Sequence, residues 1–137
     1  MDKKIIVKIS EGLGNQFFMY ANALSLSKKF NFDLYIDNPS GYYKKKDIRS
    51  YLLNYFKLSA QPAHEKFIYN GLYRNFIKKI KVKMDFFYTY KNFLNEHKNL
   101  NKETFYKAIN LDNLNNIFYI DGNFESEKYF LEYKNHL

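Results

Sequence analysis

The chain has 137 residues, 46% hydrophobic and 26% charged, a balance that predicts a folded domain and excludes a disordered chain. It contains no cysteine, which excludes a disulfide framework and a thiolate metal site. Basic residues outnumber acidic ones, giving a net charge of +8. This charge favours anionic partners but does not choose among nucleotides, nucleic acid and an acidic membrane face.

The beginning of the chain resembles a leader peptide only superficially. Residues 5–7 are apolar, but Lys8 and Glu11 interrupt this run too early for a signal sequence. No stretch approaches the roughly 20 apolar residues that span a bilayer. We therefore expect a cytoplasmic protein, with at most peripheral contact at the inner face of the membrane.

Residues 5–36 predict a βαβ unit. Residues 5–9 form a β-branched run typical of a buried strand, and residues 10–16 interrupt it with two glycines. From Phe17 the apolar positions follow a helical period up to Lys28 and Lys29, whose charges suit the last turn of a helix. A second strand is expected at residues 33–36, before a turn at residues 37–41. Together these elements predict an α/β fold with a parallel sheet flanked by helices.

The rest of the chain carries weaker signals. Residues 48–56 and 62–83 show helix-like apolar spacing, residues 85–90 read as a strand, and residues 92–116 predict loops with a short helix near 104–109. Residues 117–120 predict a third strand, and residues 126–133 predict a helix with Ser126 as its N-cap. There is no internal repeat and no flexible linker, so we expect a single domain over residues 1–137.

The motif with most chemical content is Glu11–Gln16, directly after the first strand. The glycines Gly12 and Gly14 let the backbone pass close to a bound group, and the following helix offers N–H donors to an anion. The neutral amides of Asn15 and Gln16 are suited to hold a phosphate or a sugar hydroxyl. The motif therefore predicts a site for a phosphorylated ligand.

Two alternatives remain open for this motif. The glycines could serve only to make the corner between a strand and a helix. An NAD site would use Asp37, at the end of the second strand, to bind the ribose, although Phe17 stands where the third glycine of the dinucleotide motif belongs. The phosphate-loop motif that ends in Gly-Lys-Ser/Thr is absent from the sequence.

Three short segments carry a resemblance to a known enzyme family. Residues 7–21 are similar to a strand followed by Gly-Gly-Leu-Gly-Asn-Gln-Met-Phe-Gln-Tyr-Ala, with Glu11 in place of the first glycine, Phe17 in place of Met and Met19 in place of Gln. The second segment resembles an Arg-x-x-x-Leu-x-x-Phe block and consists of Tyr42, Tyr43, Arg49, Leu52 or Leu53, and Phe56. Residues 119–130 resemble Gly-Tyr-Trp-Gln-Ser-Glu-Lys-Tyr-Phe. In this order the segments resemble the α-1,2-fucosyltransferases, glycosyltransferase family 11.

The resemblance implies a GT-B-type glycosyltransferase with Rossmann-like halves. It would transfer fucose from GDP-fucose to a galactose-containing glycan acceptor in polysaccharide or lipopolysaccharide synthesis, without a metal or other cofactor. It places the donor site at Gly12, Gly14 and Asn15, with Gln16 as a support, and it assigns no catalytic residue.

The family's His-x-Arg-Arg-Gly-Asp-Tyr motif does not occur in the sequence. We therefore expect residues 1–137 to be the Rossmann-like N-terminal half, with the C-terminal donor-binding domain absent and little transferase activity in this chain alone. A separate C-terminal half or a homo-oligomer is the partner that this interpretation implies.

The rival hypothesis is a non-catalytic basic α/β module that associates with a partner glycosyltransferase or an anionic surface. Lys78, Lys79, Lys81 and Lys83 are expected on the solvated face of a helix, with contact to an anionic membrane as their alternative role. No nucleic-acid recognition motif is present.

Overall fold

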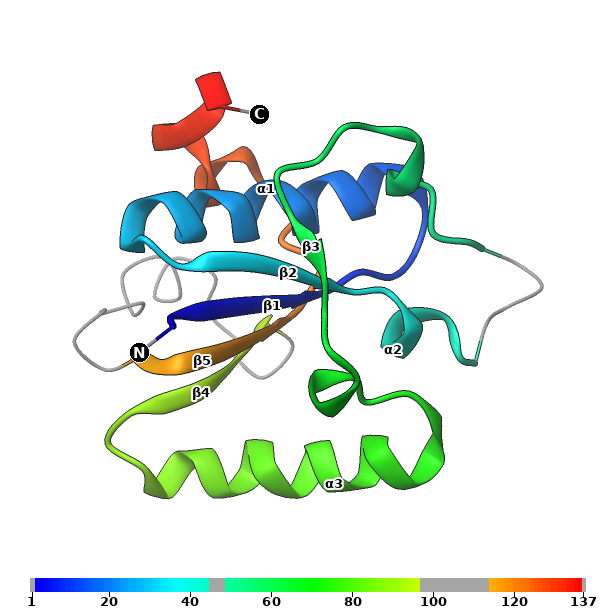
Figure 1. Cartoon of the computed structure of the whole chain (residues 1–137), viewed down its shortest axis with the longest axis vertical. Coiled ribbons are helices and arrows are strands. Elements are labelled where there is room, and N and C mark those ends of the chain that lie inside the picture. Colours follow the sequence, from blue (N-terminus) through cyan, green and yellow to red (C-terminus); the bar gives the residue numbers. More distant parts are fainter. Residues whose placement is uncertain (1, 45–48, 97–113, 137) are drawn as a thin grey trace.

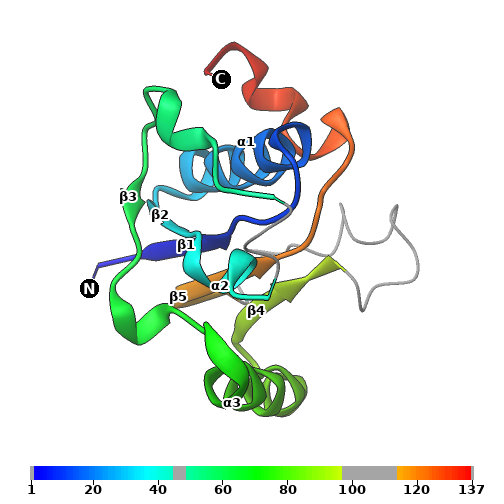
Figure 2. The same ribbon diagram turned by 90° about the vertical axis from the view of Figure 1, so that its right-hand side faces the viewer.

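The centre of the molecule is a five-stranded sheet. The computed structural model describes residues 2–44, 49–96 and 114–136. The strands are β1 (Lys4–Lys8), β2 (Asp33–Asp37), β3 (Gln61–Pro62), β4 (Lys91–Asn95) and β5 (Leu114–Asp121). They lie in the order β3-β2-β1-β5-β4, and every described pairing is parallel. Helices α1 (Leu13–Phe30) and α3 (Gly71–Met84) cover opposite faces (Figures 1 and 2).

This arrangement confirms the expected α/β fold with a parallel sheet flanked by helices. The strand order departs from the sequential 3-2-1-4-5 of a standard doubly wound sheet, because β5 lies next to β1 and β4 forms the edge. No helix in the described ranges combines the length and the apolar character needed to cross a membrane.

The predicted βαβ unit is present, with a shift at the start of its helix. α1 begins at Leu13 and not at Phe17, so Gly14, Asn15 and Gln16 form its first turn. Gly12 is the N-cap in extended backbone conformation, and Lys28 and Lys29 occupy the last turn, as expected. The glycine segment is therefore a short corner that continues directly into the helix.

The two faces of the sheet differ in chemistry. On the α1 face, branched and aromatic side chains of three strands join the inward side of α1 in one buried cluster, which includes Ile5, Val7, Leu34, Ile36, Phe118, Ile120, Met19, Ala23 and Leu24. The other face carries Lys8, Asp37, Tyr119 and Asp121 at the ends of β1, β2 and β5. The large apolar cluster thus lies on the α1 face, and α3 packs on a mixed face that combines Ile6 and Tyr119 with charged residues.

The turn expected at residues 37–41 contains a short helix, α2 (Pro39–Tyr42). The carboxylate of Asp37 accepts hydrogen bonds from the backbone N–H of Ser40 at 3.0 Å and from its hydroxyl at 2.6 Å, which fixes the beginning of this helix. Gly41 lies against the end of β1, where an added Cβ would be 1.8 Å from the carbonyl oxygen of Ile9.

The middle of the chain differs from its sequence-based expectation. The described part of the 48–56 segment contains only a 3-10 turn at Leu53–Tyr55, and α3 begins at Gly71, well after the expected position 62. The strand expected at residues 85–90 is wrong: Asp85–Phe87 is a 3-10 turn, and β4 follows it within the segment expected to form loops. The helix expected near 104–109 lies outside the described residues.

A buried carboxylate explains where β4 begins. The side chain of Asp85 accepts hydrogen bonds from the backbone N–H of Asn92 at 2.9 Å and of Phe93 at 3.1 Å. These bonds tie the end of α3 to the start of β4, a contact that periodicity does not reveal. At the other end of the chain, the strand at 117–120 is confirmed within β5, and Ser126 is the predicted N-cap. The helix expected there is two 3-10 turns, Glu127–Tyr129 and Leu131–His136.

We expect Gly41→Ala to lower the free energy of unfolding by about 2–4 kcal/mol, because its Cβ would overlap a backbone oxygen that cannot rotate away. Gly14→Ala is the matched control. Its Cβ would meet no atom within 4 Å, so its stability should equal that of the wild type or exceed it by up to about 1 kcal/mol. Urea unfolding followed by circular dichroism measures both, and equal midpoints for the two variants would contradict this packing.

Candidate functional site

The corner between β1 and α1 lies at the carboxyl end of the parallel strands. This edge is where open α/β sheets bind their ligands. In the described part of the chain, the backbone N–H groups of Gly12, Leu13, Gly14 and Asn15 have no hydrogen-bond acceptor. They stand at the positive end of the α1 dipole, a combination that attracts anions.

Gly12 and Gly14 face open space. A Cβ added at either position would meet no described atom within 4 Å, whereas one at Gly122 would lie 2.5 Å from Glu96. Gly12 has φ −80°, which any residue adopts, and Gly14 is helical. Neither the backbone dihedrals nor packing among the described residues requires glycine at these two positions.

The strained residue of the corner is Glu11. Its φ of 65° places a non-glycine residue in the left-handed region. The hydroxyl of Tyr42 donates to the Glu11 carbonyl at 2.9 Å, and the Glu11 carboxylate pairs with Arg49. Burial, followed by the negative charge of Glu11, raises the pKa of Tyr42 to about 12, so Tyr42 remains a hydrogen-bond donor at neutral pH. Arg49 neutralises the acidic group that stands beside the corner.

Gln16 holds the corner together from inside. Its side chain is fully buried, and its Nε2 donates to the carbonyl oxygens of Glu11 at 3.0 Å and Ser50 at 2.9 Å. Its Oε1 accepts from the N–H of Leu52 at 2.9 Å. Both amide hydrogens are therefore used within the protein, which makes Gln16 a support of the corner and not a ligand contact.

Asn15 points toward the exit of β5. Its Nδ2 donates to Glu125 Oε1 at 3.0 Å, and Asn123 donates to the same oxygen at 3.2 Å. Among the described residues its Oδ1 has no partner. Of the amides named by the sequence, Asn15 is thus the one available at the surface of the corner.

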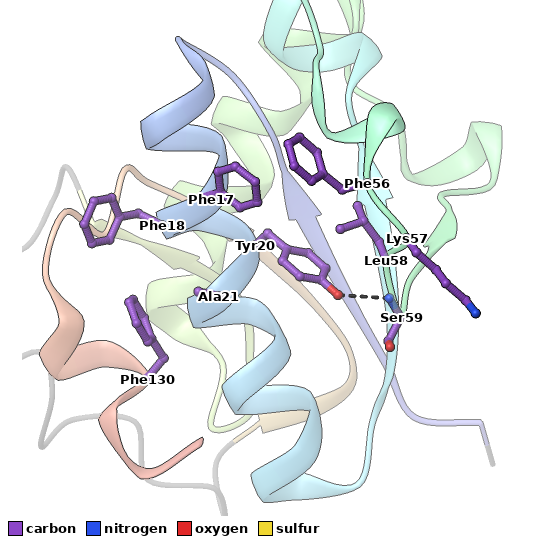
Figure 3. A pocket seen from close by; sticks show the side chains of 9 residues that line it. All are labelled: Phe17, Phe18, Tyr20, Ala21, Phe56, Lys57, Leu58, Ser59 and Phe130. Atoms are coloured by element: carbon purple, nitrogen blue, oxygen red, sulfur yellow. Dashed lines mark hydrogen bonds between the residues drawn. The ribbon is translucent and has the colours of Figure 1, made fainter. Parts of the chain in front are cut away.

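A pocket of about 410 Å³ runs along the first turns of α1 (Figure 3). Phe17 contacts Phe56 edge to face with ring centroids 4.9 Å apart, and on the other side Phe18 lies 6.0 Å from Phe130. The hydroxyl of Tyr20 accepts a hydrogen bond from the N–H of Ser59 at 3.0 Å. The walls are mostly aromatic, so this pocket suits a flat or apolar ligand surface and offers little to hold an anion.

The three sequence segments that share the family resemblance meet at this corner. The segment at residues 7–21 contacts the second segment through Glu11–Arg49, Gln16–Leu52 and Phe17–Phe56. It contacts the third through Asn15–Glu125 and Phe18–Phe130. Sequence reasoning selected these segments but did not show that Arg49 and Glu125 stand on either side of the glycine corner.

Asp37 does not serve an exposed ribose site. Its carboxylate is fully buried and accepts from Ser40 and from the hydroxyl of Tyr119 at 2.6 Å. The NAD alternative, which requires this carboxylate at the surface, is therefore wrong for Asp37.

A second polar cluster lies on the α3 face, where Asp121 pairs with Lys8 at 2.8 Å and with the buried Lys78. Burial alone would raise the pKa of Asp121, but the two ammonium groups outweigh it and hold that pKa below its ordinary value. Burial lowers the pKa of Lys78, and Asp121 offsets only part of this effect. The cluster fastens α3 to the sheet.

Comparisons with protein-family models, with curated proteins and with solved structures found no match for this chain. Among the described side chains, no group of three or more histidine, aspartate or glutamate residues is placed to hold a metal ion.

We expect Gln16→Leu to lower the free energy of unfolding by about 2–4 kcal/mol, because the three hydrogen bonds of the buried amide to Glu11, Ser50 and Leu52 would be lost. Asn15→Ala removes one bond at the surface and should change stability by less than about 1 kcal/mol. Urea unfolding compares the two. A Gln16→Leu protein as stable as Asn15→Ala would show that the buried amide does not hold the corner.

We expect Asp121→Asn to destabilise the fold by about 3–5 kcal/mol at neutral pH, because it leaves the buried Lys78 without its counter-charge. Since the folded-state pKa of Asp121 lies below its ordinary value of 3.8, its contribution is complete above that value and is lost as the pH falls below it. The difference between wild type and variant should therefore shrink below about pH 4. Urea unfolding at pH 3, 4, 5 and 7 measures it.

Glu127→Gln is the control for this measurement, because it breaks the exposed pair between Glu127 and Lys134 and should change stability by less than about 1 kcal/mol. A difference between wild type and Asp121→Asn that stays constant from pH 3 to pH 7 would contradict the role of the charged carboxylate.

Proposed function

We propose that this chain is a sugar-nucleotide-binding domain of a glycosyltransferase with a GT-B-type, Rossmann-like architecture, similar to the α-1,2-fucosyltransferases. In this proposal the corner of Gly12, Gly14 and Asn15 receives the diphosphate and the adjoining sugar of GDP-fucose. The neighbouring surface forms part of the acceptor side of the cleft. The activity to which it contributes is transfer of fucose to a galactose-containing glycan.

The observation that carries the proposal is the meeting of the three resembling segments at one open corner. Segments that resemble a family only by chance would not be expected to come together around the same four backbone amides. The position of the corner at the carboxyl edge of the sheet supports the same conclusion.

The chemistry of the corner suits a diphosphate. Unpaired backbone N–H groups at a helix N-terminus bind phosphate oxygens, and glycines without a Cβ allow those oxygens to approach closely. Asn15 adds a neutral side chain beside them. Gln16 holds the corner from the interior through its bonds to Glu11 and Ser50.

We assign nucleotide binding to this corner, and we do not assign fucose transfer to it. Departure of a nucleoside diphosphate needs a cation positioned to receive the developing charge. Arg49 is the arginine beside the corner, and Glu11 occupies its guanidinium. We therefore expect the chain to bind GDP more readily than it transfers fucose.

In isothermal titration calorimetry with GDP, we expect Asn15→Ala to weaken binding by about tenfold, the size of one hydrogen bond from the second Nδ2 hydrogen, which Glu125 does not use, to a phosphate oxygen. Gly14→Ala should weaken it as well, because its Cβ would enter the space above the amides. The matched control is Gln61→Ala, which removes an exposed amide on the edge strand β3 and should leave GDP affinity unchanged.

Parallel titrations with UDP and NAD distinguish the ligand class. A preference for GDP supports the fucosyltransferase-like proposal, whereas equal affinity for UDP points to another sugar nucleotide. No heat of binding with any nucleotide at millimolar concentration would refute the donor site and favour the non-catalytic module.

A further inference from the structure

α3 has the reverse of the usual orientation for an amphipathic helix. Its one buried side chain is Lys78, with 6% of its surface exposed, while the apolar Leu72 and Phe76 are 79% and 61% exposed. Tyr73, Ile80 and Met84 are exposed as well. At 100° per residue these five side chains fall within one arc of the helix, on the side opposite Lys78.

A buried ion pair between α3 and the sheet sets this orientation. Lys78 reaches Asp121 and also lies over the ring of Tyr119, 4.8 Å from its centroid. Because the charged side chain is the one drawn inward, the apolar arc must point outward. A cavity of about 600 Å³ remains between the last turns of α3, at Lys81 and Met84, and the sheet, so this end of the helix is not closely packed.

The apolar surface continues beyond the helix. Phe86 and Phe87 follow directly in a 3-10 turn, are 83% and 84% exposed, and contact one another edge to face at 5.7 Å. Tyr88 and Tyr90 are exposed next to them. We call the exposed apolar arc of α3 together with Phe86 and Phe87 the α3 surface. The helix itself lies across the sheet from α1 (Figure 2).

The charges around the α3 surface are of one sign. α3 contains Arg74, Lys78, Lys79, Lys81 and Lys83 and no acidic residue. Lys79 and Lys83 are exposed and have no acidic partner in the described ranges, and in helical projection they lie beside Leu72 and Phe76. Asp85, which follows α3 in the chain, is buried and engaged with β4, and Asp121 is paired with Lys8 and Lys78.

We propose that the α3 surface binds the face of an anionic lipid bilayer, with its aromatic and aliphatic side chains at the level of the headgroups and Lys79 and Lys83 on lipid phosphates. A basic helix with exposed Phe and Leu beside its lysines is the pattern that lies in a membrane interface. Lysine stems also reach along apolar side chains while their charges stay in water.

A second copy of the chain fits this surface less well. A twofold contact brings the same patch of each subunit together, so the basic residues of one α3 would meet a helix that carries no compensating carboxylate. An anionic bilayer supplies both an apolar layer and the opposite charge. The inference does not rest on nucleotide binding, because the glycine corner belongs to α1 and the α3 surface to the other face (Figure 1).

Co-sedimentation of the full chain with vesicles tests this surface. We expect it to bind vesicles of phosphatidylcholine with phosphatidylglycerol, not phosphatidylcholine alone, and to dissociate as salt rises. The double variant Phe86→Ser/Phe87→Ser and the double variant Lys79→Glu/Lys83→Glu should each reduce the partition coefficient about tenfold or more. Circular dichroism and GDP titration should remain as in the wild type for both, which separates a failure of this surface from a failure of the donor site.

Two controls match these variants. Tyr55→Ser removes another highly exposed aromatic ring, and Lys28→Glu/Lys57→Glu changes the net charge by the same amount at exposed lysines outside α3. Both should retain at least half of the wild-type partition coefficient. An equal loss in the charge control would overturn the proposal, because attraction would then come from overall charge.

The absence of binding to anionic vesicles would also overturn it. So would a dimer in sedimentation velocity that Phe86→Ser/Phe87→Ser dissolves, since a second copy would then cover the surface. Tight binding of a single-stranded oligonucleotide through Lys79 and Lys83, without vesicle binding, would assign the surface to another polyanion.

Discussion

The buried amide of Gln16 is the interaction on which the candidate site depends. It joins the end of β1, at Glu11, to a segment far along the chain, at Ser50 and Leu52. An amide is suited to this task because it donates and accepts at once and carries no charge that would have to be compensated inside the protein. With the corner fixed from within, the N–H groups of Gly12 to Asn15 are left pointing outward, and those groups give the proposed donor site its chemistry.

The unequal faces of the sheet shape the rest of the molecule. One face buries an apolar cluster under α1. On the other face, the strands β1, β2 and β5 end in the charged residues Lys8, Asp37 and Asp121. α3 is held on that second face by the pair of Lys78 and Asp121, so its apolar side chains remain outside. The donor proposal and the membrane proposal thus arise from the two faces of one sheet, and each has its own structural cause.

The proposed function is supported by residue types along the chain and by contacts in space. The resemblance of three segments to the α-1,2-fucosyltransferases concerns residue types in order along the chain, whereas their contacts at the corner concern space. Glu11 illustrates why both are needed. It replaces a glycine of the family pattern at a residue with positive φ, and Arg49 and Tyr42 stabilise the corner around it. The ion pair with Arg49 and the hydrogen bond from Tyr42 therefore compensate locally for the presence of Glu11 in place of glycine.

The sequence by itself determined the βαβ unit, the last strand and the Ser126 cap, because β-branched runs, helical period and capping residues act over a few neighbouring positions. It also identified the residues of the corner. Only the tertiary structure decided that Gln16 supports the corner, that Asp37 is enclosed, that β4 follows a turn at Asp85 and that Lys78 lies inside. Each of these depends on the partner of a buried polar group, and that partner is brought near by chain topology and not by local pattern.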